Sequence, residues 1–384
     1  MDKKNNFWQK TNGVWCLLII IAIFGYMGVV MGASNMLNTI MHTAHDLLLN
    51  TVFFLMAICV LMGALSRVMA EFGVVDLLQK LLNPLMKPLF NLPGVASLGA
   101  VMTFLSDNPA IISLAKDKKF AKYFKKHQFI SLTNFGTAFG MGLIVIVFMI
   151  SQGFFWEPLV GLLGAVCGCI VSTRLMQRFV LKKYPSFSKE SALDIAQRLS
   201  EDNAAEEEKE SREGGFIRLL NAVLDGGKSG VDVGLAIIPG VLVISTLVMI
   251  LTFGPSASGA YTGAAYEGTE LLPWVAGKIN FIFDWLFGFN DPHLVAFPIT
   301  ALGAVGAALS LVPNFISEGW VNGNAIAVFT AIGMCWSGYL STHTAMLDTL
   351  GYRKLTGKAI LAHTIGGLAA GIMAHWVYVL ITLL

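Results

Sequence analysis

The chain has 384 residues, of which 55% are hydrophobic and 13% charged, and its formal net charge is +2. Soluble domains carry about 25% charged residues, so the composition predicts an integral membrane protein. A nearly neutral chain without a clustered basic surface excludes nucleic acid as a partner. Five cysteines lie in apolar runs without CxxC spacing, so we expect no metal site and no cofactor beyond a coupling sodium ion or proton.

Seven segments are apolar over the length of a membrane-spanning helix. In chain order they are 14–32, 48–70, 128–151, 155–180, 231–254, 323–348 and 359–383. The first begins after three lysines and is long for a signal peptide, so we interpret it as a retained helix. Segments 74–90 and 270–289 are amphipathic, which is typical of helices that lie along the membrane interface.

Two further apolar segments contain one motif written twice. Residues 98–113 are LGAVMTFLSDNPAIIS and residues 302–317 are LGAVGAALSLVPNFIS, with nine of sixteen positions identical. Both copies have a Ser-x-x-Pro break, at Ser106 to Pro109 and at Ser310 to Pro313. Broken apolar segments at matching places in two halves indicate a transporter's binding site. Unpaired backbone at membrane depth is tolerated only where it lines a cavity, so we predict two re-entrant hairpins broken at these points.

The basic residues set the expected topology. Compact clusters at 3–10, 116–126, 174–183 and 353–358 all lie inside if the N-terminus is inside and the C-terminus outside. The two halves then have opposite orientation, as in an inverted-topology repeat. The predicted fold class is therefore an all-α integral membrane protein. It has about seven transmembrane helices, two re-entrant helical hairpins and two interfacial amphipathic helices.

Four regions follow from this reading. We predict an N-terminal transmembrane helix with an outer loop, a first repeat, a cytoplasmic charged linker and a second, inverted repeat. Their bounds are 1–47, 48–181, 182–230 and 231–384. The linker, with an acidic run at 206–210, is expected to be solvated. In the outer loop, His42, His45 and Asp46 have no further ligand nearby in sequence, so we do not predict a metal site there.

With the hairpins placed, the chain resembles the Gate (nucleoside recognition) family of membrane proteins. The resemblance rests on LLNPLMKPLFNLPG followed by LGAVMTFLSDNPAIIS, and it covers roughly 48–180 and 218–383. The family is similar in architecture to the core of concentrative nucleoside transporters and to the membrane part of the ferrous-iron transporter B. In the nucleoside transporters, hairpin tips and partly unwound neighbouring helices hold the solute at mid-membrane. The absence of a GxxxxGK[ST] sequence argues against a GTPase-linked iron transporter.

Asp107 and Asn108 are the sharpest candidate site residues, since they follow Ser106 at the predicted tip of the first hairpin. An intramembrane carboxylate is a functional candidate by default. Alternatively, Asp107 caps the second half of the hairpin. The second copy has Leu311 and Val312 at these positions, so a break does not require an acid there. Asp107 is therefore predicted to bind solute or a coupling cation.

The remaining candidates are neutral hydrogen-bonding groups. Ser310, Asn314 and Ser317 belong to the second hairpin, and we predict that Ser106, Asp107, Asn108, Asn134, Ser310 and Asn314 surround one polar cavity. The helices after the hairpins correspond through Thr133-x-x-Gly136 and Thr330-x-x-Gly333, which adds the candidates Thr133, Asn134, Thr330 and Ser337. Ser and Thr in membrane helices often bond only to their own backbone, so a structural role stays open for these.

The expected function is a secondary active transporter in the cytoplasmic (inner) membrane of a bacterium. It moves a small polar or anionic organic solute, nucleoside-like among the options, by alternating access with sodium or proton coupling. An enzyme is not expected, because the sequence has no HExxH, GxSxG or paired catalytic carboxylates. The alternative is a non-transporting Gate-type subunit or scaffold that partners another membrane protein. The expected partners are the solute, the lipid bilayer and, through helix 14–32 and the amphipathic helices, a second copy of the chain.

Overall fold

The computed structural model describes residues 3–106, 110–201 and 214–384, and these residues are mostly helical. Six helical stretches are long and apolar enough to cross a membrane, which agrees with a multi-pass membrane protein. They are Asn12–Met31, Ala33–Glu71, Lys126–Ser151, Glu157–Lys183, Gly215–Thr252 and Arg353–Thr382. The sixth of the predicted segments, 323–348, is divided into two shorter helices.

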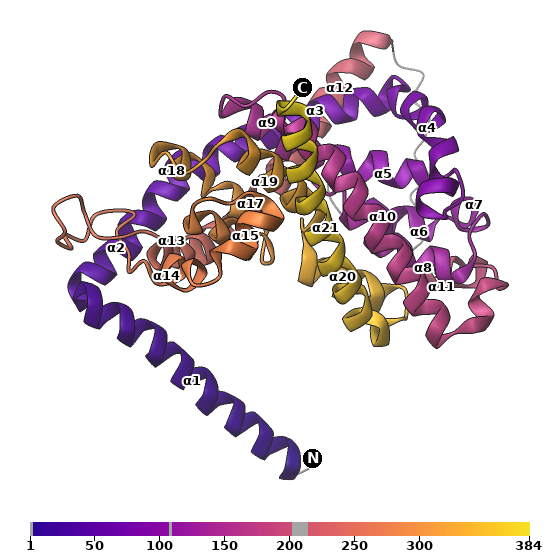
Figure 1. Ribbon diagram of the computed structural model, residues 1–384. Helices are drawn as coiled ribbons and strands as arrows, with labels where there is room; N and C mark the ends of the chain where they lie inside the picture. Colours follow the sequence, from indigo (N-terminus) through magenta and orange to yellow (C-terminus); the bar gives the residue numbers. More distant parts are fainter. Residues whose placement is uncertain (1–2, 107–109, 202–213) are drawn as a thin grey trace.

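The predicted outer loop after the first helix is itself helical. Helix α1 (Lys3–Met31) is followed by α2 (Ala33–Asp46), a π-helical turn (Leu47–Val52) and α3 (Phe53–Glu71). The polar residues of α2 had suggested a loop, but Met36, Thr39 and Thr43 form a buried face. This periodicity makes α2 an amphipathic helix. Helix α1 projects away from the rest of the molecule, and many of its apolar side chains are exposed (Figure 1).

Two helix pairs with glycine-lined crossings organise the molecule. Helix α3 packs along α12 (Gly215–Pro239), and α10 (Glu157–Lys183) packs along α21 (Thr356–Thr382). A Cβ atom built on Gly63 would lie 2.4 Å from the Gly226 carbonyl oxygen, and one built on Gly226 would lie 2.4 Å from the Gly63 oxygen. Gly168 and Gly366 face each other in the same reciprocal way, at 2.5 and 2.8 Å. Only glycine permits backbones to approach this closely.

Each half contributes one helix to each crossing, so the two pairs join the halves. In the first half, the elements between the paired helices are α4 (Val74–Leu85), a π-helical turn (Met86–Phe90), α5 (Ala96–Leu105), α6 (Ala110–Lys116), α7 (Lys118–Ala121), α8 (Lys126–Thr137) and α9 (Gly142–Ser151). In the second half, they are a π-helical turn (Gly240–Ser245), α13 (Thr246–Thr252), α14 (Leu271–Gly277), α15 (Asn280–Phe287), a 3₁₀ turn (Pro292–Val295), α16 (Ala296–Ala301), α17 (Val305–Leu309), α18 (Val312–Ser317), α19 (Gly323–Cys335), α20 (Tyr339–Thr349) and a 3₁₀ turn (Arg353–Leu355).

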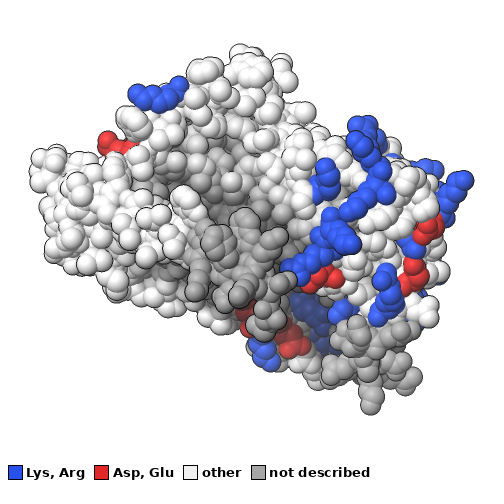
Figure 2. Space-filling model, turned by 90° about the horizontal axis from the view of Figure 1, so that it is seen from below, with Lys and Arg blue, Asp and Glu red and all other residues white. Residues whose placement is uncertain are grey.

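The predicted amphipathic segments are helical. Segment 74–90 contains α4, with Leu77 and Leu81 exposed, while segment 270–289 forms two helices, α14 and α15, with Trp274 and Trp285 exposed. Exposed leucine and tryptophan on short helices fit a membrane interface. Figure 2 shows Lys and Arg gathered over one side of the molecule, the side on which Figure 1 shows α7, α8 and α11 (Leu193–Glu201). This distribution is compatible with basic clusters on one face of the membrane.

Much of the predicted solvated linker 182–230 is folded. A 3₁₀ turn (Pro185–Ser188) and α11 follow α10, and α11 packs on α6 and α7. The Lys126 ammonium binds the carboxylates of Glu190 and Asp194, at 2.7 Å each. Helix α12 already begins at Gly215, so the expected boundary at residue 231 falls inside a helix. The acidic run 206–210 lies outside the described residues.

Candidate functional site

The first hairpin consists of α5 and α6, which pack on each other. Helix α5 ends because Ser106 leaves helical conformation, with φ −130° and ψ −112°. The Leu105 carbonyl accepts a hydrogen bond from the Ser66 hydroxyl of α3, at 2.7 Å. The break predicted after Ser106 therefore begins where it was expected, and Asp107, Asn108 and Pro109 lie outside the described residues.

A cavity of about 350 Å³ separates the first hairpin from α12. Its walls come from α3, the end of α5 and α12, with Ile144 of α9 contributing one apolar side chain. Gly63, Gly226 and Gly230 line it, so the close helix crossing forms one wall. A volume of this size is typical of small-molecule sites.

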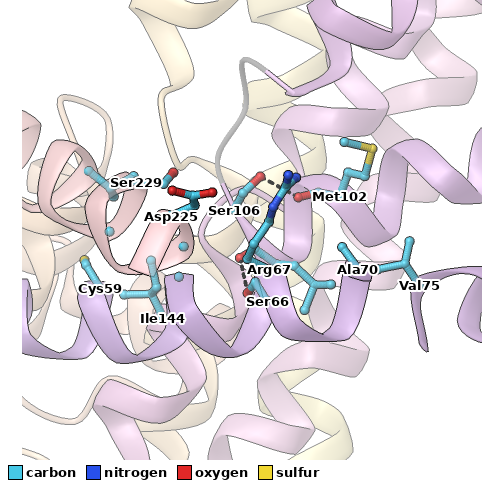
Figure 3. A pocket seen from close by; sticks show the side chains of 15 residues that line it. Cys59, Ser66, Arg67, Ala70, Val75, Met102, Ser106, Ile144, Asp225 and Ser229 are labelled. Carbon is cyan, nitrogen blue, oxygen red and sulfur yellow. Dashed lines mark hydrogen bonds between the residues drawn. The ribbon is translucent and has the colours of Figure 1, made fainter. Parts of the chain in front are cut away.

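Polar and charged groups gather on one side of this cavity. Figure 3 shows Arg67, Ser106, Asp225 and Ser229 together above α3, with Cys59 toward one end of the view and Ala70 and Val75 toward the other. Ser66 completes the set of three serines. One guanidinium, one carboxylate and several hydroxyls against an apolar wall suit a small solute with both polar and apolar parts.

The second hairpin is built differently from its sequence copy. Helices α16 and α17 pack on each other, and the chain between them is Leu302 to Ala304, with Ala304 extended at φ −164° and ψ 131°. The tip therefore contains the letters LGA, which lie inside α5 in the first hairpin. Ser310 and Leu311 keep helical angles, so 305–317 is almost one continuous helix. The predicted break at Ser310 to Pro313 is wrong, because Pro313 lies in the first turn of α18, where a missing N–H costs little.

The second hairpin packs on the π-helical turn that follows α12 and touches α12 itself at Ile237. A Cβ atom on Gly306 would lie 2.3 Å from Ile237, and one on Gly240 would lie 3.2 Å from the Cβ of Ala304. The Ser245 hydroxyl donates to the Ala307 carbonyl at 3.0 Å. A serine of a long helix thus binds a hairpin carbonyl in each half, Ser66 in the first and Ser245 in the second.

The helices that follow the hairpins are both broken near their middle. Met141, between α8 and α9, has φ +55°, and Gly338, between α19 and α20, has φ +81°. The two breaks touch, because the Ser337 hydroxyl donates to the Thr137 carbonyl at 3.3 Å. The sequence predicted unbroken helices over 128–151 and 323–348, and the structure corrects this. Partly unwound helices were implied only by the family resemblance.

Several predicted site residues use their polar groups within the helix bundle. The hydroxyls of Thr133, Thr330 and Ser310 donate to carbonyls three or four residues earlier, as the structural alternative expects. The Asn134 amide is fully buried and donates to the Ser172 hydroxyl at 3.0 Å and the Ala359 carbonyl at 2.9 Å. These bonds join α8 to α10 and α21.

The described candidates do not surround one cavity. Ser106 lines the cavity at the first hairpin, and Asn314 lines a separate one beside the second. Ser317 is exposed and donates to the Asn314 carbonyl at 2.8 Å. The role of the ten candidate residues as solute ligands stays a prediction.

Sequence reasoning missed Arg67 and Asp225, the two charged residues of the larger cavity. A signal was present for Arg67, because an arginine inside a predicted membrane-spanning segment is a functional candidate. Asp225 fell in the predicted linker, where a charge needs no explanation. Because the start of α12 was predicted too late in the sequence, one of the two charged residues of this cavity was not recognised.

The comparisons with known proteins agree with this architecture. Residues 48–153 match the Gate family model, described as nucleoside recognition. This Gate segment contains α3, the first hairpin and both parts of the first broken helix. It therefore supplies the cavity lining that comes from α3, from the end of α5 and from Ile144. The resemblance recognised in the sequence is confirmed for this segment.

An uncharacterized protein of Alkalihalophilus pseudofirmus is 22% identical to the chain over 254 residues, which are 64% of this chain and 53% of the relative. The chain thus spans about half of that relative's length. Its match to the chain carries no assignment of solute.

Among solved structures, the fold is similar to that of CNTnw, a concentrative nucleoside transporter. The inward-facing substrate-bound state has a TM-score of 0.55 at 14% identity, over 83% of this chain and 73% of that one. An outward-facing variant also has 0.55 at 14%, over 93% and 89%. The intermediate 2 state of another variant has 0.53 at 14%, over 97% and 83%. The chain therefore has the fold of a membrane transporter.

Proposed function

We propose that this protein is a secondary active transporter that moves a small polar or anionic organic solute by alternating access. The observation that carries the proposal is the cavity between the first hairpin and α12, with Arg67 and Asp225 in its wall. A guanidinium binds carboxylate or phosphate oxygens in a forked geometry, which favours an anionic or strongly polar solute. Asp225 and the serines supply acceptors and hydroxyls for the remaining polar groups. A nucleoside-like solute fits the same description.

In this proposal, the α3–α12 pair is the fixed part, and the hairpins with the α10–α21 pair are the moving part. The similarity to CNTnw in inward-facing, intermediate and outward-facing states supports such a division. The repeats 48–181 and 231–384, with α12 extending the second one back to Gly215, supply equivalent elements to both parts. Coupling to a sodium or proton gradient belongs to the proposal.

The alternative is a non-transporting Gate-type subunit. Helix α1, with its exposed apolar side chains, offers a surface for a partner membrane protein or for a second copy of this chain. That surface is compatible with both functions, whereas a cavity with Arg67 and Asp225 in its wall, between the fixed pair and the first hairpin, favours transport.

Proteoliposome uptake separates the two. The purified chain is reconstituted and offered nucleosides, carboxylates and amines under imposed sodium or proton gradients. Transport predicts gradient-dependent accumulation of at least one solute class, and Asp225→Asn should reduce it. Arg218→Gln is a matched control, because Arg218 lies on the same helix and pairs with Glu71 outside the cavity. Accumulation that is absent for every class, together with co-purification of a second membrane protein, would support the scaffold.

A further inference from the structure

A second cavity, of about 240 Å³, lies beside the second hairpin. It is formed where the junction of α2 and α3, the end of α9, helix α18 and the loop between α13 and α14 meet. The lining residues are Asp46, Asn50, Thr51, Phe54, Phe148, Gln152, Tyr266, Pro313 and Asn314. None of them lines the cavity at the first hairpin.

Asp46 gives this cavity its charge. The Asn50 amide donates to one carboxylate oxygen at 2.7 Å, and the Tyr266 hydroxyl donates to the other. No lysine or arginine lines the cavity, and Asp46 forms no ion pair with any residue the structure describes. Neutral donors orient the carboxylate but leave its charge uncompensated, which favours a cationic ligand.

Two backbone irregularities hold these groups in place. Asn50 and Thr51 lie on the π-helical turn Leu47–Val52, and such turns are frequent at functional sites. Tyr266 has φ +65°, a conformation that non-glycine residues rarely adopt. It is fixed by its backbone N–H, which donates to the Thr43 hydroxyl at 2.9 Å. Strained residues over-determined by their surroundings cluster at ligand sites.

Two phenylalanine rings form the apolar part of the cavity lining. Phe54 and Phe148 meet edge to face, with ring centroids 6.2 Å apart. Aromatic faces attract organic cations, and their C–H edges provide apolar contact for an attached carbon skeleton. A bare inorganic ion would fill only a small part of a cavity of this volume.

We propose that this cavity binds a small organic ammonium ion. The ammonium group would lie against the Asp46 carboxylate, the amide oxygens of Gln152 and Asn314 would accept its remaining N–H groups, and the carbon skeleton would pack on Phe54 and Phe148. The site goes beyond the proposed transport function, because it involves the second hairpin and is measured by binding alone.

Benzylamine is a suitable probe, since it is protonated at neutral pH and benzyl alcohol is its neutral counterpart. We expect benzylamine to raise the melting temperature of the purified full-length protein in potassium phosphate buffer, with saturation. Benzyl alcohol at equal concentration should not. Asp46→Asn should weaken benzylamine binding at least tenfold. Asp284→Asn, an equal charge change on exposed α15 outside this cavity, should leave it unchanged.

Asn50→Lys is a second variant, because Asn50 is exposed and one helical turn from Asp46. Its tethered ammonium should compete with the ligand and abolish benzylamine binding in a folded protein. Equal stabilisation by benzyl alcohol, or equal loss in Asp284→Asn, would overturn the proposal. Sodium that blocks benzylamine with the same dependence on Asp46 would assign the cavity to an inorganic cation instead. Each outcome is independent of whether uptake is observed.

Discussion

The two hairpins are sequence copies of each other, yet they meet α12 in different ways. A cavity of about 350 Å³ separates the first hairpin from α12, and Ser106 at its tip is exposed. The second hairpin contacts α12 directly, with Val305 to Val312 buried. If the two halves form the predicted inverted repeat, such a difference describes one state of a pair. We infer that the structure is open at the first hairpin and closed at the second, and that alternating access exchanges the two arrangements.

Arg67→Gln should have the largest effect on this comparison. Losing a charged donor from the open cavity removes about 1.5–3 kcal/mol of binding free energy, which corresponds to roughly a 10- to 100-fold increase in the KM of uptake. Initial rates in proteoliposomes measure this. Arg218→Gln should keep the KM of the natural protein, and a normal KM in Arg67→Gln would remove the cavity from the solute's path.

Gly306→Val should weaken the closed side. Its side chain would meet Ile237 of α12, and overpacking of this kind costs about 1–3 kcal/mol. Gly99→Val is the matched change, since its side chain would meet Ile111 of its own hairpin. Both variants should melt at lower temperature, but only Gly306→Val should speed maleimide labelling of a cysteine placed at Ala307. Equal labelling rates would mean that the α12 contact does not close the second hairpin.

The two serine contacts sharpen the comparison further. Ser66→Ala leaves the Leu105 carbonyl without the hydroxyl that binds it, and we expect a loss of about 1–2 kcal/mol in unfolding free energy. Ser245→Ala should lose less than about 1 kcal/mol, because the Ala307 carbonyl also accepts from Ser310 at 2.7 Å. Denaturant unfolding in detergent gives both values. A larger loss of unfolding free energy in Ser245→Ala than in Ser66→Ala would show that the serine contact in the second half is the stronger one.

The smallest effect concerns α11, which packs on α6 and α7 of the first half. The hydrogen bond from Lys126 holds the pKa of Glu190 below its usual value of about 4.3, so this contact stabilises the folded protein at neutral pH and is lost as the pH falls through the lowered pKa. Glu190→Gln should therefore resemble the acid form at pH 7 and expose 185–201 to limited proteolysis slightly faster. Identical cleavage rates would show that the contact does not hold α11.

The sequence allowed the class of protein, the helical character of the amphipathic segments and the end of a helix at Ser106 to be predicted, because apolar length and periodicity are local signals. The tip of the second hairpin was predicted at the wrong residues, because the same sequence has a different structure in each half. The letters LGA lie within α5 in the first half and at the hairpin tip in the second. Whether Ser-x-x-Pro ends a helix or begins its first turn depends on what packs around it, which a repeat alone does not contain. The helix breaks at Met141 and Gly338 were also missed, because they too depend on packing against other parts of the chain.

The charged residues of the two cavities were harder to predict. Asp225 and Asp46 lay in segments interpreted as a linker and a loop, and their meaning depends on long-range packing against α3 and Tyr266. A single sequence shows that an acidic residue exists, but it does not show which charged groups lie near that residue in the fold.

The central claim is that hairpins move against the α3–α12 pair, and a reversible cross-link tests it most directly. In a background without the native cysteines, Gly240→Cys and Ala304→Cys join the π-helical turn that follows α12 to the second hairpin. A Cβ on Gly240 lies 3.2 Å from that of Ala304, near disulfide range. Met56→Cys with Gly234→Cys, at 3.0 Å, joins α3 to α12 as a control. We predict that oxidation stops uptake only in the first pair and that reduction restores it. Undiminished uptake with the hairpin disulfide formed would contradict the account.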